Sequence, residues 1–139
     1  MNYLLDTCVI SELVKKTPVR KVVEWVGMQD ESACFLSVLT MGEIQKGISR
    51  TGNAARQRVL QTWLDTDLRQ RFSDRILSIS EEVAVTWGAM QGTLEASDRP
   101  VPTIDGLLAA TALTYNLTIV TRNEMDMAPT GARIMNPWK

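Results

Sequence analysis

Short runs rich in apolar residues recur along the chain and alternate with longer segments of helical periodicity. Runs of four to six such residues suit strands that are buried on both faces, as in a parallel sheet covered by helices. The alternation therefore predicts an α/β fold, with a mainly parallel central sheet of about five strands flanked by helices on both faces. The runs occupy residues 1–5, 33–38, 75–80, 117–121 and 132–135.

The segments between these runs predict the helices and loops. Segments 40–50 and 54–70 are separated only by the break Thr51-Gly52-Asn53, so we expect a helical hairpin there. Residues 122–131 are predicted to form a loop. A chain of 139 residues without repeats or interdomain linkers is predicted to form a single domain, residues 1–139. The remaining predicted helices occupy residues 19–28, 80–95 and 103–115.

Composition limits the possible partners. The net charge is −1, so any nucleic acid must be met by a local basic patch and not by a global field. The longest apolar stretches, such as residues 106–113, fall short of the ~18 residues that a membrane span requires. The N-terminus lacks the features of a secretory signal. Cys8 and Cys34 suit small buried residues, so we expect a cytoplasmic protein with no membrane partner.

The chain contains no histidine. This absence removes the usual Ser-His and Cys-His pairs of nucleophilic catalysis. With only two cysteines, it also leaves no zinc-binding set of nitrogen and sulfur ligands. A metal bound by this chain would therefore have oxygen ligands, which favour Mg²⁺, Mn²⁺ or Ca²⁺.

Carboxylates stand at equivalent points of the predicted sheet. Asp6 ends the first strand, while Glu43 and Asp105 lie in the first turns of two predicted helices. Asn123, with Asp126 three residues later, follows the strand that ends at residue 121. The carboxyl ends of parallel strands face one edge of a sheet, where ligands bind in α/β folds, so these groups can converge. Clustered carboxylates repel one another and favour a divalent cation between them.

Each of these residues also has a purely structural interpretation. Asp6 could be a helix N-cap, and Thr40-x-x-Glu43 has the pattern of a capping box. Asp105 is favoured near a helix start by the helix dipole, and Asp126 could serve a turn before Ala128-Pro129. The four interpretations together fit less well than a shared site, because Asp105 stands in an otherwise apolar helix.

Several segments resemble the PIN-domain ribonucleases, and specifically the VapC-type toxins of toxin–antitoxin pairs. They follow the order and spacing of that family across the whole chain. Asp6, Glu43 and Asp105 match the three invariant acidic residues of the family, and Thr7 matches the hydroxyl residue beside the first. The segments are LLDTCVISELVKK, LSVLTMGEIQKGI, TIDGLLAATAL, LTIVTRNEMDM and MNPWK.

Two positions depart from the family pattern. Asn123 occupies the family's fourth acidic position. Many relatives read Thr-Arg-Asn-x-x-Asp, and that pattern would give the role to Asp126 in this chain. Cys8 stands where the family most often has Asn.

The resemblance implies Mg²⁺-dependent cleavage of RNA, with Mn²⁺ as a substitute, by a toxin that inhibits translation or growth. Asp6, Asp105 and Glu43 would hold the metal, and Glu43 could instead orient the attacking water. The resemblance also implies a cognate antitoxin in the active-site groove, a homodimer, and a larger assembly on DNA through the antitoxin.

Basic residues of the predicted hairpin would lie near the acidic edge and could bind the RNA backbone. A solvated helix face is the alternative for this group, and Trp63 suits the core better than a base-stacking role. A phosphatase with Asp6 as nucleophile is disfavoured by Cys8, two residues later, where such enzymes have Asp. A catalytically silent RNA- or protein-binding PIN-like module remains the other hypothesis. The basic residues are Lys46, Arg50, Arg56 and Arg58.

Overall fold

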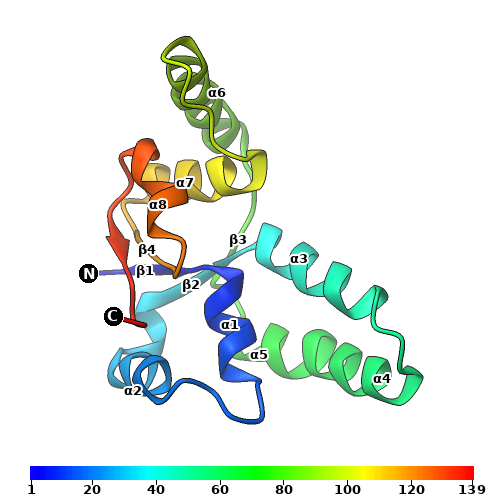
Figure 1. Cartoon of the computed structure of the whole chain (residues 1–139). Helices are drawn as coiled ribbons and strands as arrows, with labels where there is room; N and C mark the ends of the chain where they lie inside the picture. Colours follow the sequence, from blue (N-terminus) through cyan, green and yellow to red (C-terminus); the bar gives the residue numbers. More distant parts are fainter.

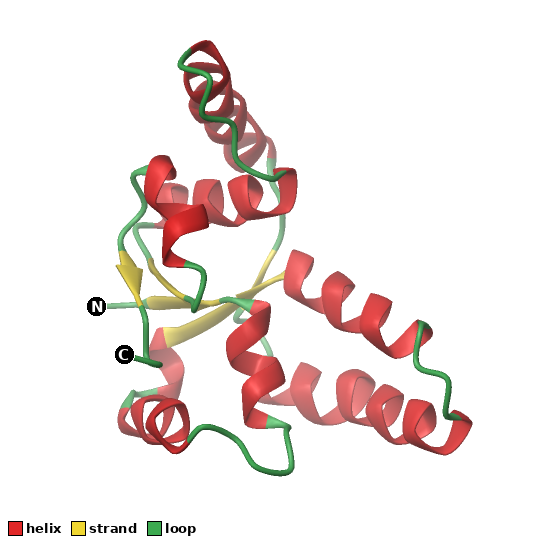
Figure 2. Cartoon of the chain, viewed as in Figure 1, coloured by secondary structure: helices red, strands yellow, loops and turns green.

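The computed structural model describes all residues, 1–139, and contains a five-stranded sheet in the order β3-β2-β1-β4-β5. Every adjacent pair of strands is parallel, and helices cover both faces (Figure 2). The predicted α/β class, the parallel sheet and the five strands are confirmed. The strands are β1 (Tyr3–Leu5), β2 (Cys34–Ser37), β3 (Ile76–Leu77), β4 (Thr118–Val120) and β5 (Ile134–Met135).

Side-chain alternation along β1 divides the apolar core in two. Leu4 and Leu5 are both buried, but they belong to different clusters because successive strand residues point to opposite faces. Leu5 packs with residues such as Val9 and Leu64, and Leu4 packs with residues such as Leu108. A strand that contributes to both cores reads as a continuous apolar run, as the N-terminal segment does.

Helices divide between the two faces accordingly (Figure 1). One face carries the helices from the first half of the chain, and the other carries α6, α7 and α8. None of the helices is long and apolar enough to cross a membrane. The helices are α1 (Thr7–Leu13), α2 (Arg20–Met28), α3 (Val38–Ser49), α4 (Ala54–Thr62), α5 (Arg69–Arg71), α6 (Glu81–Ala96), α7 (Thr103–Tyr115) and α8 (Glu124–Met127).

The predicted hairpin forms and projects from the body of the molecule as α3 and α4 (Figure 1). Asn53 caps α4 by accepting a hydrogen bond from the backbone N–H of Arg56 at 3.0 Å. The helix then passes through a π-helical segment, Trp63–Leu68, before α5. This segment buries Leu64 and Leu68 against the sheet.

The prediction of a loop at residues 122–131 was wrong. This segment contains α8 and a 3-10 turn, Ala128–Thr130. Met127 is fully buried in the core beneath α7, and its backbone N–H donates to the carbonyl of Asn123. Burial of this one side chain stabilises a helix too short for a periodic pattern to reveal.

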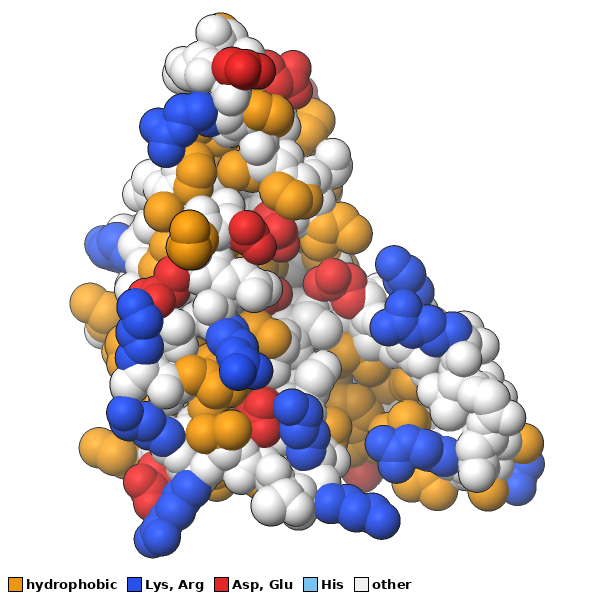
Figure 3. Space-filling model, in the orientation of Figure 1, with side chains coloured by type: hydrophobic (Ala, Val, Ile, Leu, Met, Phe, Trp, Pro, Cys, Tyr) orange, Lys and Arg blue, Asp and Glu red, His pale blue; other side chains and the backbone are white.

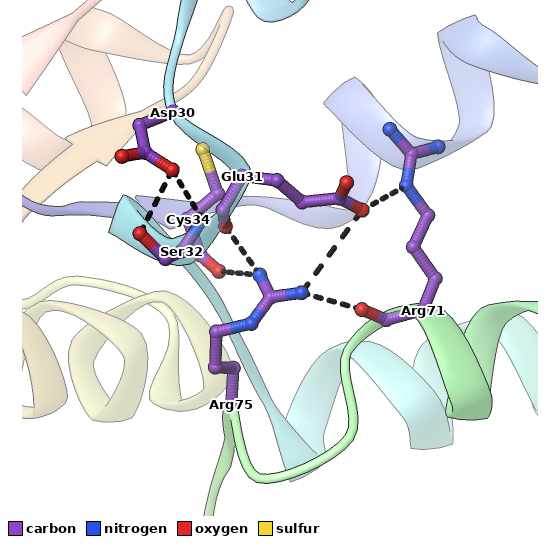
Figure 4. A network of polar contacts seen from close by, with 6 residues as sticks. All are labelled: Asp30, Glu31, Ser32, Cys34, Arg71 and Arg75. Atoms are coloured by element: carbon purple, nitrogen blue, oxygen red, sulfur yellow. Dashed lines mark hydrogen bonds and ion pairs between the residues drawn. The ribbon is translucent and has the colours of Figure 1, made fainter.

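Arg75 connects the end of α5 to the start of β2 (Figure 4). Its guanidinium donates to the backbone carbonyls of Glu31 at 2.5 Å, Cys34 at 2.6 Å and Arg71. The same group lies 4.9 Å from the ring centre of Phe72. Because the group satisfies three carbonyls at once, it aligns the short strand β3 with β2.

Candidate active site at the carboxyl ends of the strands

The carboxyl ends of β1, β2 and β4 meet at one edge of the sheet. There β1 leads into α1 and β2 leads into α3, while the first turn of α7 approaches from the other face (Figure 1). Each predicted acidic residue belongs to one of these junctions or to α8. The topology therefore brings together segments that lie far apart in the sequence.

Asp6 stands between β1 and α1 and is only 6% exposed. Its Oδ1 accepts a hydrogen bond from the Thr7 backbone N–H at 2.7 Å, so Asp6 does cap α1. Its Oδ2 accepts from the Thr121 hydroxyl at 2.8 Å. Burial nevertheless raises the pKa of Asp6 above its ordinary value, and the charge of Glu43 adds to this rise. The N-cap and site interpretations of Asp6 are thus compatible.

Glu43 does not form the capping box that was its structural alternative. Helix α3 begins at Val38, because Ser37 is its N-cap and accepts from the backbone N–H of Leu39 at 3.0 Å. Glu43 therefore lies beyond the first turn, and its Oε1 accepts from the Thr7 hydroxyl at 2.6 Å. Thr7, the residue beside Asp6, thus connects α1 to Glu43 on α3, a contact that a helix cap does not explain.

Asp105 is the clearest sign of convergence. Burial raises its pKa, and the charges of Asp6, Asp126 and Glu43, in that order, raise it further. Asp105 therefore lies within electrostatic reach of all three. Asn123 contributes its backbone N–H to the Thr121 hydroxyl at 3.0 Å and is the N-cap residue of α8. At the fourth position, Asp126 is thus the residue whose charge reaches Asp105.

Two of the carboxylates line open hollows of the surface, Glu43 beside the hairpin and Asp126 on α8, while Asp6 is buried. No three acidic or cysteine side chains lie close enough together to form a ready-made metal-binding cluster. Their oxygen chemistry and mutual charge effects nevertheless suit a hard divalent cation, which is often held by one or two carboxylates together with water and substrate phosphate. The donor set therefore fits Mg²⁺ or Mn²⁺ better than zinc.

A groove of about 410 Å³ leads from the carboxylates along the hairpin, between α1, α3 and α4. Figure 3 shows acidic side chains in the notch beside the hairpin and basic side chains along it. Lys46, Arg50 and Arg56 line the groove with Glu43, but Arg58 does not. Trp63 packs against the core and also lines the groove, so its predicted core position is only partly correct.

Sequence reasoning gave Thr121 and Lys15 no role, and it considered Thr40 only as part of a helix cap. Thr121 contacts both Asp6 and Asn123, and Thr40 lies within 3.3 Å of the Thr7 hydroxyl. Lys15 adds a further cation to the groove. Thr121 could have been found, because a hydroxyl at the end of a buried strand occupies the position that Asp6 has on β1. Nothing local to Lys15 or Thr40 indicates their placement.

Comparison with known proteins extends these observations. The PIN domain family profile matches residues 3–128. The chain is 30% identical to "Toxin FitB" of Neisseria gonorrhoeae over 97% of each protein. It is 28% identical to "VapC ribonuclease Y4jK" of Sinorhizobium fredii over 98% of this chain and 97% of that protein.

Solved structures agree with the sequence matches. The crystal structure of FitAcB from Neisseria gonorrhoeae superimposes with a TM-score of 0.93 at 30% identity, covering 98% of each chain. The structure of FitAB bound to the IR36 DNA fragment gives a TM-score of 0.92 at 28% identity, covering 99% of this chain and 96% of that one. The fold is thus shared over essentially the full length of both chains.

Proposed function

The chain belongs to the PIN-domain family, and on that premise we propose that it is a divalent-metal-dependent endoribonuclease acting as the toxin of a toxin–antitoxin pair. The observation that carries this proposal is the convergence of acidic residues at one edge of the sheet, where Thr7, the residue after Asp6, donates to Glu43 at 2.6 Å. Burial raises the pKa of Asp105, and the charges of three other carboxylates raise it further. Such a cluster is unfavourable unless a cation neutralises it. The ribonuclease and toxin names of the relatives support the same reaction class.

Asp6 and Asp105 are the proposed metal ligands, and Asp126 is the proposed fourth acid. Bound there, Mg²⁺ or Mn²⁺ would lower the pKa of water and stabilise negative charge on the phosphate. The hydrogen bonds from Thr7 and Thr121 hold both oxygens of Asp6 in place. Because the carboxylate is already held in one orientation, it loses little rotational freedom when it binds the ion.

Glu43 has the geometry to orient the attacking water or to act as a further ligand. Its Oε1 is occupied by the Thr7 hydroxyl at 2.6 Å, and its Oε2 has no protein donor. The free oxygen can accept a proton or a hydrogen bond from water at the edge of the groove. Thr7 is therefore proposed as the residue that orients Glu43.

The RNA backbone is proposed to lie along the hairpin groove. Lys46, Arg50 and Arg56 lie in the same hollow as Glu43, and a polyanion approaching carboxylates requires such cations. Lys15 also lines the groove, but its ammonium group is paired with Glu12 at 3.0 Å. The basic lining of the groove supports this proposed path for the RNA.

A cognate antitoxin is proposed as the protein partner. An apolar cavity of about 380 Å³ adjoins the groove, and Val14 and Trp63 line both hollows. A peptide arm could bury apolar side chains in the cavity and continue toward Glu43. The similar FitAB structure contains DNA, which supports a larger assembly on DNA through the antitoxin. Exposed Val85, Ile104 and Leu113 on α6 and α7 suit the proposed homodimer.

Cleavage of an end-labelled single-stranded RNA by the purified protein tests the enzymatic proposal. We expect cleavage with Mg²⁺ or Mn²⁺, none with EDTA, and none from Asp6→Asn in either condition. RNA binding without cleavage under all metal conditions would instead favour the catalytically silent module. Cleavage that survives EDTA would contradict the metal-dependent mechanism.

A further inference from the structure

A second hollow lies beside α8 and contains one of the site carboxylates, Asp126. It is shallow, with a volume of about 520 Å³, and is formed by the segment after β4 and by residues near the C-terminus. We call it the Arg122 shelf. Its polar and aromatic lining includes Arg122, Asn123, Asp126, Asn136, Trp138 and Lys139.

Arg122 is the available cation of this shelf. Its side chain is exposed and takes part in none of the five ion pairs of the chain. Its guanidinium carbon lies 5.5 Å from the ring centre of Trp138, so the indole supports the cation from one side. Lys139, by contrast, is engaged by Glu124 at 2.6 Å.

The shelf is built on fixed backbone. The backbone N–H of Trp138 donates to Asn136 Oδ1 at 2.9 Å, and Asn136 Nδ2 donates to Glu124 Oε2 at 3.1 Å. These bonds connect the C-terminal segment to α8. The ring of Trp138, on which Arg122 lies, is therefore held in place by hydrogen bonds to α8.

The position of Arg122 relative to the carboxylates is also fixed. The residues before and after it, Thr121 and Asn123, are hydrogen-bonded to the site. The Asn123 N–H donates to the Thr121 hydroxyl, and that hydroxyl donates to Asp6. Asp126, which acts on Asp105, lines the shelf itself. Glu43 lines the hairpin groove and Asp126 lines the shelf. Each hollow therefore contains a different one of the site carboxylates.

From this arrangement we propose that the Arg122 shelf binds one nucleotide of a single-stranded RNA, on the other side of the carboxylates from the hairpin groove. The inference rests on the proposed ribonuclease function. Unpaired bases stack on guanidinium planes and aromatic rings, and a free guanidinium also neutralises a phosphate. The RNA strand then occupies both hollows, with the phosphate to be cleaved between them.

Fluorescence anisotropy with a labelled single-stranded adenosine RNA decamer tests the shelf. Asp105→Asn protein in Mg²⁺ serves as the starting protein, because the proposed function predicts no cleavage by it. Adding Arg122→Ala should weaken binding roughly 5- to 100-fold and reduce the salt slope by about 0.7, the contribution of one phosphate contact. Adding Arg122→Lys should restore the salt slope but only part of the affinity, because an ammonium group does not stack.

Arg20→Ala is the matched control, since Arg20 is an exposed arginine on α2 that lines neither hollow. Equal RNA affinities of the Arg122→Ala and Arg20→Ala proteins would overturn the proposal that the shelf binds a nucleotide. So would an equal loss of affinity for a duplex RNA of the same length, whose paired bases cannot stack there.

The two proposals fail separately. If the wild-type protein cleaves RNA and the Arg122→Ala change leaves RNA binding unaltered, the proposed nucleotide site on the shelf is wrong and the proposed nuclease function stands. If the wild-type protein binds RNA through Arg122 but never cleaves it, the nucleotide site on the shelf is supported and the proposed nuclease function is contradicted.

Discussion

Replacement of Thr121 by Val is expected to destabilise the protein through the carboxylate of Asp6. The Thr121 hydroxyl is fully buried and donates to Asp6 Oδ2 at 2.8 Å, while Asp6 itself is 6% exposed. Val has almost the same shape, so the packing of β4 is preserved while the donor to Asp6 and the acceptor of the Asn123 N–H are removed. The buried carboxylate oxygen then lacks its strongest partner, and water has little access to replace it.

The expected loss follows from the charge of the acceptor. A hydrogen bond to a charged group contributes about 1.5–3 kcal/mol, and an unsatisfied buried group retains its desolvation cost. For a domain of this size, each kcal/mol corresponds to about 4 °C in Tm. We therefore expect the Thr121→Val protein to melt roughly 6–12 °C lower. Thr121→Ser keeps the hydroxyl and should lose less.

Urea unfolding in EDTA, followed by circular dichroism, measures the difference. Thr118→Val is a matched control on the same strand, because the Thr118 hydroxyl is buried but has no hydrogen-bond partner. Its removal should leave the free energy of unfolding unchanged or slightly higher. Equal unfolding midpoints for the two valine variants would refute the claim that Thr121 stabilises the Asp6 carboxylate.

Three further predictions concern other parts of the chain. Hydrogen bonds from the Val19 N–H and a lysine lower the pKa of Glu12, so Glu12→Gln should be less stable than wild type at pH 7. The stability from a lowered pKa is fully present above the ordinary Glu value and is lost as the pH falls through the lowered value of the folded protein. Thermal melts of the two proteins should therefore converge as the pH falls below about 4. Gly106→Ala should cost about 1–3 kcal/mol, because its Cβ would lie 2.9 Å from an indole nitrogen of α6. Gly88→Ala meets nothing within 4 Å and should stabilise by about 0.5–1 kcal/mol in the same urea titration. Arg56→Glu should weaken RNA binding and flatten its salt dependence more than Arg58→Glu, because Arg56 lines the groove and Arg58 does not. Equal salt slopes for the two proteins in an anisotropy titration would contradict the groove assignment.

The sheet and most helices were predictable because their signals are local. The apolar run before Asp6 marks a buried strand, and the segment at residues 103–115 forms α7 with the predicted bounds. The short helix α8 was not predictable, since its four residues are stabilised by burial of Met127 in a distant core. The capping box at Glu43 failed because Ser37 caps α3 three residues earlier than the pattern suggested.

The candidate site was predictable only as a set of strand-end carboxylates. The sequence order places Asp6, Glu43 and Asp105 at junctions that a parallel sheet must bring together. Which hydroxyls orient these acids depends on side-chain contacts across the fold, as the bond from Thr7 to Glu43 shows. The charge of Asp126 reaches Asp105 only because α8 forms. Tertiary packing, and no local pattern, decides such contacts.

The dependence of the single-turnover RNA cleavage rate on Mg²⁺ concentration, compared between wild type and Asp105→Asn, tests the central claim most directly. We expect the wild-type rate to rise from zero and saturate with Mg²⁺. The Asp105→Asn protein should show a rate at least 100-fold lower, because loss of one proposed charged ligand should impair both metal binding and phosphate activation. Its melting temperature without metal should be equal to or higher than that of wild type, since like-charge repulsion is relieved. Mg²⁺-dependent turnover at the wild-type rate in the folded Asp105→Asn protein would contradict the account.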